Sequence, residues 1–568
     1  MAAMGAPTLE VDYVRPAKAS GGVDPLGVQT IGVGVYTQLL PGITNVTNRA
    51  FYYVFHPWLF SAFERRGWRS AALVRERLRR AEVLLLLIAV HHGARAGGVD
   101  REHSPAVVGI NRVWNAYPGM VRAGAVRLSD FAHRRADATR YFKAPEGGLG
   151  QYYFGSLWQL GLLDGERASK AFATDGVGTH FAARIDAALP ADAFLDALEA
   201  DRVSIATLEA LAGFCPCCLQ HPGALREDLL ALFTEGFEAI APGAVGAAAR
   251  ERDTDVAARA ESLALIQWLI SVRGWGRAGS DGAFLAERFR ALVYTLHDDA
   301  GSPLALPAGL IDCARRWQVY QRHELLSCAL QALFHGALRW LECCRAEQRF
   351  ASGQAAADAF FETGPGSAAL AETPGAHPGA WLAARASTLP GYADWGHPGH
   401  EHQRLRAAVA ASARGGLDGP GIQALTSDAL TLLAALLVRE DNADRYGAVG
   451  FRAGFFEDYP LTLERVHTLL LTHHRDATPA QAFAALLRDC CLEAHQRVAL
   501  GKLRFQGTDT FCVLETEGGL AVQGVPAIAE TTPRLANALR ILRDLALLRR
   551  ADDGALEACG EPLWERYL

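Results

Sequence analysis

Residues 157–165 read LWQLGLLDG and residues 171–176 read AFATDG, and the same pattern returns near the end of the sequence. There, residues 542–548 read LRDLALL and residues 553–560 read DGALEACG. Each copy is typical of a helix end that leads into a short apolar strand, a turn, a second short strand and a glycine. We therefore predict two small β-hairpins, each attached to the end of a helix.

The order of these elements resembles the closing helix and wing of a winged-helix module. Such a module can place an exposed helix in the major groove of DNA while its wing touches phosphate. In the C-terminal copy, Arg534, Asn537 and Arg540 are the side chains expected on the exposed face of the helix. Winged helices also serve as protein-interaction modules, so nucleic-acid contact, protein contact and the absence of a true wing all remain open.

The 568 residues have the composition of a soluble globular protein, with 50% hydrophobic and 21% charged residues. Alanine and leucine dominate, which favours helix. The expected fold class is mainly α, a multi-helical body with small winged-helix-like β-hairpin additions. We expect six regions: a basic, aromatic-rich helical region over 1–145, a winged-helix-like unit over 146–220, a helical domain over 221–350, a Gly/Pro-rich loop or linker over 351–420, a helical domain over 421–505, and a hairpin with a winged-helix-like unit over 506–568.

The charge is distributed unevenly along the sequence. The net charge is −6, but residues 1–150 carry 19 Lys and Arg residues against 11 Asp and Glu residues. A basic N-terminal quarter on an acidic body favours a polyanion or an acidic protein as partner. The candidate contacts in this quarter are Arg49, Arg69, Arg75, Arg79 and Arg80. The alternative is that these arginines form solvated faces and intramolecular ion pairs.

Several features favour a cytoplasmic location. The start of the sequence lacks a charged segment followed by an apolar core, so no secretory signal is predicted. The aliphatic run from Val83 to Val90 is far shorter than the roughly 20 residues of a membrane helix, and it predicts a buried helix instead. The adjacent pairs Cys343-Cys344 and Cys490-Cys491 fit a reducing compartment better than a disulfide scaffold. No membrane partner is expected.

One cysteine cluster is a candidate metal site. Cys215 and Cys218 have the two-residue spacing that lets two thiolates hold one zinc ion, and His221 follows closely. A structural site needs four ligands, and the sequence contains no second Cys-x-x-Cys. The cysteines Cys343 and Cys344 or the histidines His397, His400 and His402 could complete it only through folding. The alternative is a buried turn with small apolar thiols. Apart from this zinc ion, no cofactor is expected.

Motifs for nucleotide chemistry and catalysis are missing. Lys502 follows Gly501, but Leu503 stands where a phosphate-binding loop needs Ser or Thr. No Gly-x-Ser-x-Gly elbow is present, and none of the four lysines forms a Glu-x-Lys beside paired carboxylates. The sequence therefore favours a protein that is not an enzyme, without deciding the matter.

The segment from Leu39 to Arg49, LLPGITNVTNR, is followed by Tyr52-Tyr53 and Pro57-Trp58. This order resembles the opening of an uncharacterised family of bacterial proteins with a signature of LPGxT, Thr-x-Arg, paired aromatic residues and Pro-Trp. The resemblance covers residues 25–70, and Ala50-Phe51 stand where a second arginine is expected. Genes of this family are often found among anti-phage defence genes. The resemblance thus implies a multi-gene defence system as the setting and assigns no catalytic residue.

Our leading hypothesis is a non-enzymatic nucleic-acid-binding or scaffolding subunit of a bacterial anti-phage defence complex. Duplex DNA or another nucleic acid, and a protein partner such as a helicase or nuclease, are the expected partners. The first alternative is a divergent metal-dependent nuclease or toxin. The second is a pure protein-interaction subunit whose basic residues face an acidic partner.

Overall fold

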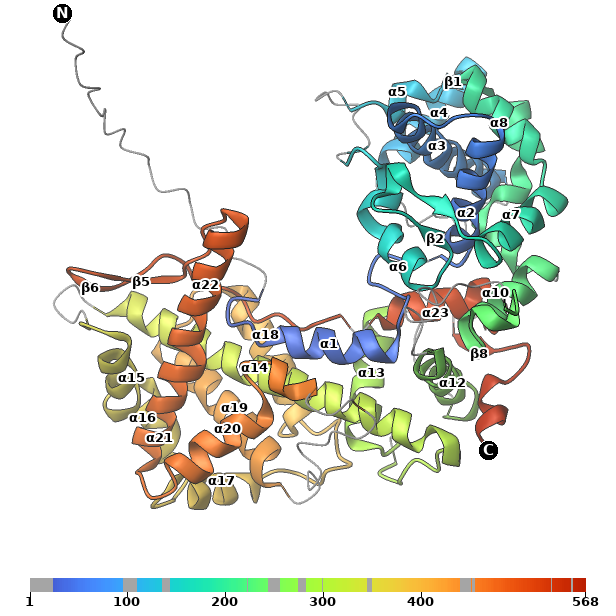
Figure 1. Cartoon of the computed structure of the whole chain (residues 1–568). Helices are drawn as coiled ribbons and strands as arrows, with labels where there is room; N and C mark the ends of the chain where they lie inside the picture. The colour runs from blue at the N-terminus through green and yellow to red at the C-terminus, as the bar shows by residue number, and fades with distance from the viewer. Residues whose placement is uncertain are drawn as a thin grey trace, which may run out of the picture. The chain divides into compact units, whose positions relative to one another are not determined.

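The computed structural model describes residues 24–47, 49–95, 110–134, 142, 144–221, 223–243, 256–273, 282–298, 300–344, 350–439, 451, 455–532, 534–552 and 555–568. The chain divides into two compact units (Figure 1). Unit 1 comprises residues 1–32, 322–448 and 452–531, and unit 2 comprises residues 33–321, 449–451 and 532–568. These units replace the six consecutive regions predicted from the sequence, because each unit gathers segments that are far apart along the chain.

Unit 2 is helical with three small antiparallel hairpins or strand pairs. Two helices, α1 (Gln29–Leu39) and α14 (Ile311–Cys343), contribute residues to both units. The other helical elements of unit 2 are α2 (Phe51–Arg65), α3 (Ala71–Arg95), α4 (Ile110–Ala123), α5 (Ser129–Ala132), η1 (Leu149–Tyr153), α6 (Phe154–Gln159), η2 (Ala168–Lys170), α7 (Val177–Ala188), α8 (Ala191–Ala200), α9 (Ile205–Ala210), η3 (Ala212–Phe214), η4 (Pro216–Gln220), α10 (Ala224–Thr234), η5 (Phe237–Ala239), α12 (Val256–Arg273), α13 (Gly282–Thr295), η7 (Ala308–Leu310), α23 (Leu535–Asp544) and η13 (Leu563–Tyr567). Its strand pairs are β1 (Ala125–Arg127) with β4 (Arg202–Ser204), β2 (Leu163–Asp164) with β3 (Phe172–Ala173), and β7 (Leu548–Arg550) with β8 (Leu556–Ala558).

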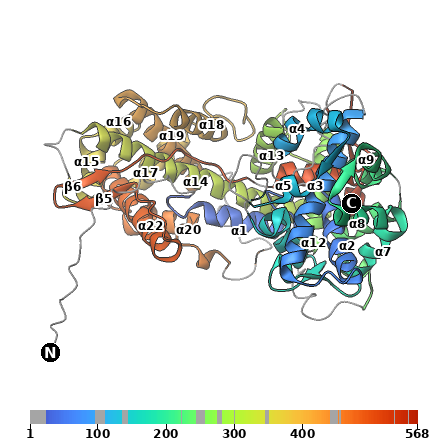
Figure 2. The same cartoon turned by 90° about the horizontal axis from the view of Figure 1, so that it is seen from above.

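The core of unit 2 is built on α2 and on the second half of α3. Twelve of the 15 residues of α2 are buried, as expected for a helix that is apolar on all sides. It packs against α7, beside which it lies in both views (Figure 2). The indole nitrogen of Trp58 on α2 donates to Asp186 on α7 at 2.8 Å. In α3 the run from Val83 to Val90 is buried throughout, which confirms the prediction of a buried helix.

The two predicted hairpins are present, and they match in atomic detail. In the first copy Gly161 ends α6 with φ +66°, and in the second Ala546 ends α23 with φ +57°. Leu162 donates its amide to the carbonyl of Leu157 at 2.9 Å, and Leu547 donates to Leu542 at 2.9 Å, so both helices end in a Schellman motif. The strand register is also the same, with Leu163 opposite Ala173 and Leu548 opposite Ala558. Asp553 and Gly554, the predicted turn of the second copy, lie outside the described residues.

Unit 1 surrounds the apolar helix α19 (Gly419–Val438). Its other elements are α15 (Gly353–Glu362), α16 (Pro365–Ala371), α17 (Pro378–Ala386), α18 (Glu401–Arg414), η10 (Phe455–Asp458), α20 (Leu463–Thr468), η11 (Leu469–His473), α21 (Pro479–Leu486), η12 (Leu487–Leu492), α22 (Glu493–Gln506), and the antiparallel strands β5 (Val513–Thr516) and β6 (Gly519–Val522). By length and composition α19 could cross a membrane, but 72% of its most apolar window is buried in the protein. This burial is typical of the core helix of a soluble protein.

The prediction of a loop or linker over 351–420 is wrong, because α15, α16, α17 and α18 occupy most of that range. Pro365 and Pro378 stand in the first turn of α16 and α17. Proline is favoured at the first helical position, where its missing N–H costs no hydrogen bond and its fixed φ suits the helix. The pairs Gly364-Pro365 and His377-Pro378 therefore begin helices.

Two helices of unit 1 contain π-helical turns. The segment η11 continues α20 to its end, and η12 joins α21 to α22 without a break. A π-helical turn inserts one residue into the helix and shifts the side chains that follow it to another face, and such turns are frequent at functional sites.

Thr478 and Gln481 form a capping box at the start of α21, as their spacing predicts for this position.

Candidate functional site

The arginines of α3 that were predicted to bind nucleic acid make contacts within unit 2. Arg75 forms an ion pair with Glu146 at 3.0 Å. Arg79 and Arg80 donate to main-chain carbonyls, Arg79 to that of Ala132 at 2.7 Å. These half-buried arginines tie α3 to distant segments of the chain. A charge reversal at Arg75, Arg79 and Arg80 would therefore break structural contacts and could not report on nucleic-acid binding alone.

Two further predicted contacts lie inside the protein. Arg49 is 3% exposed and forms a buried ion pair with Asp544 at 3.0 Å. Asn537 is 7% exposed and donates to a main-chain carbonyl, so the prediction that it is exposed is wrong. Arg534 is half-buried, with its guanidinium 4.8 Å from the centre of the Tyr36 ring. Arg49 and Asn537 cannot reach a nucleic acid, because α23 turns its polar residues at 537 and 544 inward.

Arg69 and Arg540 are the two exposed residues of the predicted set. Their role in binding stays a prediction. Seven of the ten residues of α23 are buried, so this helix has little free face to place in a DNA groove. The helix and hairpin of the second copy are thus present, but the burial of this helix argues against a winged helix that binds DNA.

The predicted histidine cluster lies at the start of α18. His400 is fully buried, accepts the amide of His402 at its Nδ1 at 3.1 Å, and donates from Nε2 to the carbonyl of Tyr392 at 3.1 Å. Burial lowers the pKa of His400. The neighbouring Glu401 forms a buried ion pair with Arg439 at 2.9 Å. These contacts occupy both ring nitrogens of His400 and remove it from the candidate ligands.

The cysteine cluster is brought together, with a different histidine. The sulfur of Cys217 lies 3.3 Å from that of Cys215, 3.9 Å from that of Cys218 and 3.3 Å from Nδ1 of His92. The predicted neighbour His221 is exposed and makes no side-chain contact with these sulfurs among the described contacts. The predicted pair Cys215 and Cys218 therefore belongs to a larger group of donors.

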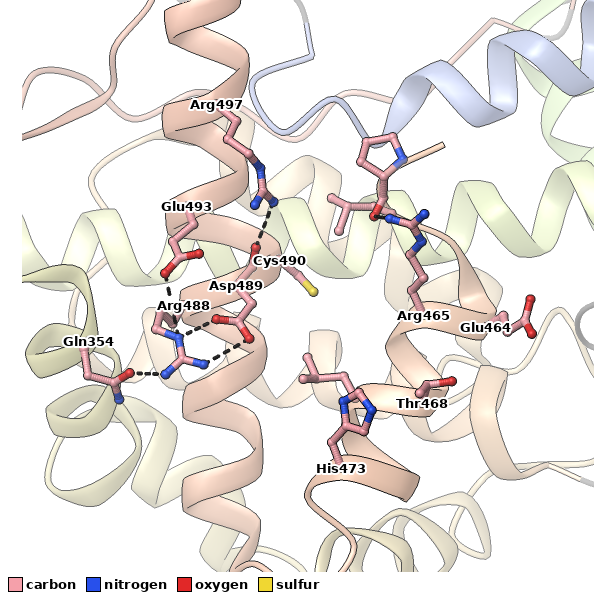
Figure 3. Close-up of a pocket in the computed structure, with 13 residues that line it drawn as sticks. Gln354, Glu464, Arg465, Thr468, His473, Arg488, Asp489, Cys490, Glu493 and Arg497 are labelled. Atoms are coloured by element: carbon pink, nitrogen blue, oxygen red, sulfur yellow. Dashed lines mark hydrogen bonds and ion pairs between the residues drawn. The ribbon is translucent and has the colours of Figure 1, made fainter. Parts of the chain in front are cut away.

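A groove in unit 1 has a volume of about 990 Å³. Figure 3 shows its two walls. One wall is η12 with the start of α22, and the other is α20 with η11, so each wall contains a π-helical turn. Its lining residues are Gln354, Pro460, Leu461, Glu464, Arg465, Thr468, Leu469, His473, Arg488, Asp489, Cys490, Glu493 and Arg497.

The first wall holds a paired arginine. Arg488 donates to the carboxylate of Asp489 at 3.0 Å and to Gln354, and it lies 3.9 Å from Glu493 (Figure 3). The hydrogen bond with Asp489 raises the pKa of Arg488. Burial raises the pKa of the Cys490 thiol to about 12, so this thiol is protonated and a poor nucleophile at neutral pH.

Three other basic side chains face the groove. Arg465 donates to the main-chain carbonyl of Pro460 at 3.1 Å, and Arg497 donates to that of Asp489 at 3.4 Å. Among the contacts of the described residues, neither guanidinium pairs with a carboxylate, and His473 makes no hydrogen bond or ion pair. Arg465, Arg497 and His473 are exposed. The arrangement can bind an anion by charge and by the donor fork of each guanidinium.

No sequence pattern predicts this groove. Arg465, Arg488 and Arg497 are ordinary members of an arginine-rich composition, and His473 is the last residue of η11, whose π-helical turn has no recognisable sequence pattern. Thr462 and Thr478 are residues of a type that favours a helix start, but they determine only where α20 and α21 begin. The register shift inside each helix decides which side chains face the groove.

Comparison of the chain with protein-family models, with curated proteins and with solved structures finds no match.

Proposed function

We propose that this protein is a non-enzymatic nucleic-acid-binding subunit of a bacterial anti-phage defence complex, and that the groove of unit 1 contacts the phosphate backbone. The observation that carries this proposal is the position of Arg465 and Arg497 on opposite walls of one groove, with His473 beside them. None of the three has a carboxylate partner among the described residues. The cytoplasmic setting is part of the same proposal.

The separation of charges in the groove, and not its net charge, favours phosphate. The lining has three arginines and three carboxylates, but Asp489 and Glu493 both lie beside Arg488, whereas Arg465 and Arg497 pair with no carboxylate among the described contacts. Contacts of arginine with phosphate carry no sequence information, and they release counterions from the nucleic acid. We therefore expect binding that depends little on base sequence and strongly on salt.

The test measures the fluorescence anisotropy of labelled single-stranded and duplex oligonucleotides with the full-length protein, between about 50 and 200 mM salt. The variant Arg465→Glu/Arg497→Glu should lose at least about tenfold in affinity, and its salt slope should fall by about 2, one for each phosphate contact. The matched control is Arg475→Glu/Arg504→Glu. It makes the same change of charge at two exposed arginines outside the groove.

Two results would overturn the proposal. The first is an absence of binding by the wild-type protein at about 50 mM salt. The second is an equal loss of affinity in the groove variant and in the control, which would mean that net charge alone attracts the nucleic acid.

The alternative of a pure protein-interaction subunit is favoured by a different observation. At the end of α22, Leu500, Leu503 and Phe505 are 57%, 45% and 79% exposed. Exposed apolar side chains that gather in one place mark interaction sites. Co-purification with proteins encoded beside this gene, after nuclease treatment, separates the two functions. If Leu503→Ser/Phe505→Ser no longer co-purifies with a partner, while Arg465→Glu/Arg497→Glu co-purifies with it as the wild type does, the result would favour the protein-interaction subunit.

The alternative of a metal-dependent nuclease receives no support from a particular contact. Nucleases of this type hold their metal with carboxylates. Within the described part of the chain, the one group of three or more converging His, Cys, Asp or Glu donors is His92, Cys215 and Cys217, which contains no carboxylate.

A further inference from the structure

We infer that His92, Cys215, Cys217 and Cys218 form a structural zinc site in unit 2. This inference is independent of the proposed function, because the site lies in another unit from the groove. It rests on three donor atoms, those of His92, Cys215 and Cys217, that the fold collects from two segments of the chain, and on the sulfur of Cys218 next to that of Cys217.

The donors come from α3 and from the turn that contains η4. His92 lies near the end of α3, and the three cysteines lie at residues 215–218, so the contact between His92 and Cys217 joins positions 125 residues apart. The donor atoms of His92, Cys215 and Cys217 all lie within 4.8 Å of one another. A group of this kind does not arise from local sequence, since the fold must bring α3 to the turn.

The distances fit tetrahedral coordination. With Zn–S bonds of about 2.3 Å and Zn–N bonds of about 2.0 Å, two ligand sulfurs lie about 3.8 Å apart, and a sulfur and a nitrogen lie about 3.5 Å apart. The measured separations from the sulfur of Cys217 are 3.3 Å to Cys215, 3.9 Å to Cys218 and 3.3 Å to His92. Each of these three separations differs from the tetrahedral value by half an ångström or less. Cys218 lies outside the group whose donors are all within 4.8 Å of one another, so it would have to move further than the other three.

The backbone at the turn directs the sulfurs to one side. The amide of Cys215 donates to the carbonyl of Ala212 at 2.9 Å, and the amide of Cys218 donates to that of Cys215 at 2.9 Å. Pro216 between them has a fixed φ and begins the short helix η4. The thiol of Cys218 contacts the Ala212 carbonyl at 3.6 Å. To take the fourth position, this sulfur would have to leave the Ala212 carbonyl and turn toward the other three donors.

Three thiolates and a neutral imidazole around Zn²⁺ carry a net charge of −1. Cys215 is fully buried, whereas His92, Cys217 and Cys218 are half-buried, which leaves a path for the ion.

Four protein ligands indicate a structural role, because catalytic zinc sites keep one position for water or substrate. The ion would fix the turn at 215–218 to the end of α3. The helix α23 packs against η4, so the same ion would also hold the surface on which the C-terminal copy of the helix and hairpin rests. Metal binding of this kind contributes directly to folding.

The experiment measures the zinc content of full-length protein purified without chelators. We expect one zinc ion per chain in the wild type and in Cys343→Ser, which alters an exposed cysteine outside the cluster. Cys217→Ser should lose the ion, since Cys217 contacts all three other donors. In the cobalt-substituted wild type, the intensity of the thiolate-to-cobalt charge-transfer band should indicate three thiolates, and it should fall by about a third in Cys218→Ser.

A second measurement uses the wild type alone, so that a misfolded variant cannot obscure the outcome. Alkylation followed by mass spectrometry reports the reactivity of each thiol. Cys215, Cys217 and Cys218 should be protected until a chelator is added, while Cys343 should react equally in both conditions. Substoichiometric zinc in folded wild-type protein, a disulfide between Cys215 and Cys217, or alkylation that does not respond to the chelator would each overturn the inference.

Discussion

The ion pair between Arg49 and Asp544 makes a strong prediction about stability. Both side chains are 3% exposed. The carboxylate of Asp544 accepts Nε of Arg49 at 3.0 Å and the amide of Ala50 at 2.9 Å, and its second oxygen lies 3.0 Å from Nη2 of Arg49. The substitution Asp544→Ala would leave a buried guanidinium without this carboxylate. Breaking a buried pair in this way costs about 3–5 kcal/mol.

The assay is hydrogen exchange of the amides of α23, measured by mass spectrometry on the peptide that covers residues 535–544. If the free energy of opening falls by about 3–5 kcal/mol, the open state becomes more populated and exchange becomes roughly 150- to 5,000-fold faster. A local measurement suits this protein, since a chain with two units has no single free energy of unfolding.

The control is the double variant Arg49→Leu/Asp544→Leu. Replacing a buried ion pair by apolar residues of similar size is often neutral or stabilising. The amide of Ala50 still loses its acceptor, which costs about 1–3 kcal/mol, so exchange should fall between that of the wild type and that of Asp544→Ala. The reasoning is refuted if Asp544→Ala exchanges within about tenfold of the wild type, or if the double variant exchanges as fast as the single one.

Three further predictions concern pH, packing and a helix cap. Burial lowers the pKa of His495, whose Nε2 accepts the amide of Cys512 at 2.8 Å, so the unfolded state binds a proton more readily than the folded state. Unit 1 should therefore lose up to about 1.4 kcal/mol of stability per pH unit as pH falls below about 6.5. The variant His495→Gln should flatten a plot of melting temperature against pH, and an unchanged slope would contradict this. Gly42→Ala should destabilise unit 2 by about 1–3 kcal/mol, because a Cβ at φ +76° would lie 2.6 Å from Leu160. The control Gly67→Ala, at φ +71°, places its Cβ where no atom lies within 4 Å, so it should lower the free energy of unfolding in urea by less. Thr478→Ala should destabilise α21 by about 1 kcal/mol, measured by hydrogen exchange of its first turn, and equal protection in both proteins would show that the capping box contributes nothing.

Local features of the fold could be predicted from the sequence. The hairpins after α6 and α23, the buried run of α3 and the capping box at Thr478 each depend on residues within about ten positions of one another. The Gly- and Pro-rich segment was misread for a related reason. Pro365 and Pro378 begin helices, and a proline that begins a helix cannot be told from one that breaks it until the following residues are known to be helical.

The candidate sites depend on contacts that the sequence does not reveal. The spacing of Cys215 and Cys218 identified a cluster, but the histidine that joins it, His92, is 125 residues from Cys217. The nearer His221 is exposed and contacts none of these sulfurs among the described contacts. Likewise, the partners of Arg79 lie 53 and 66 residues away. An arginine-rich helix therefore predicted a binding surface where the fold uses the same charges to hold itself together.

The pair of Arg49 and Asp544 also has a consequence for synthesis on the ribosome. Its members are separated by 495 residues, and all of the residues 322–448 and 452–531 of unit 1 lie between them. At about 5–20 residues per second, Arg49 waits roughly 25 to 100 s for its counter-ion. Residues 532–568 of unit 2 are made after the last segment of unit 1, so unit 2 can enclose Arg49 together with its counter-ion only when all of unit 1 has been synthesised. Chain topology thus sets an order in which unit 1 can be completed first and unit 2 is completed last.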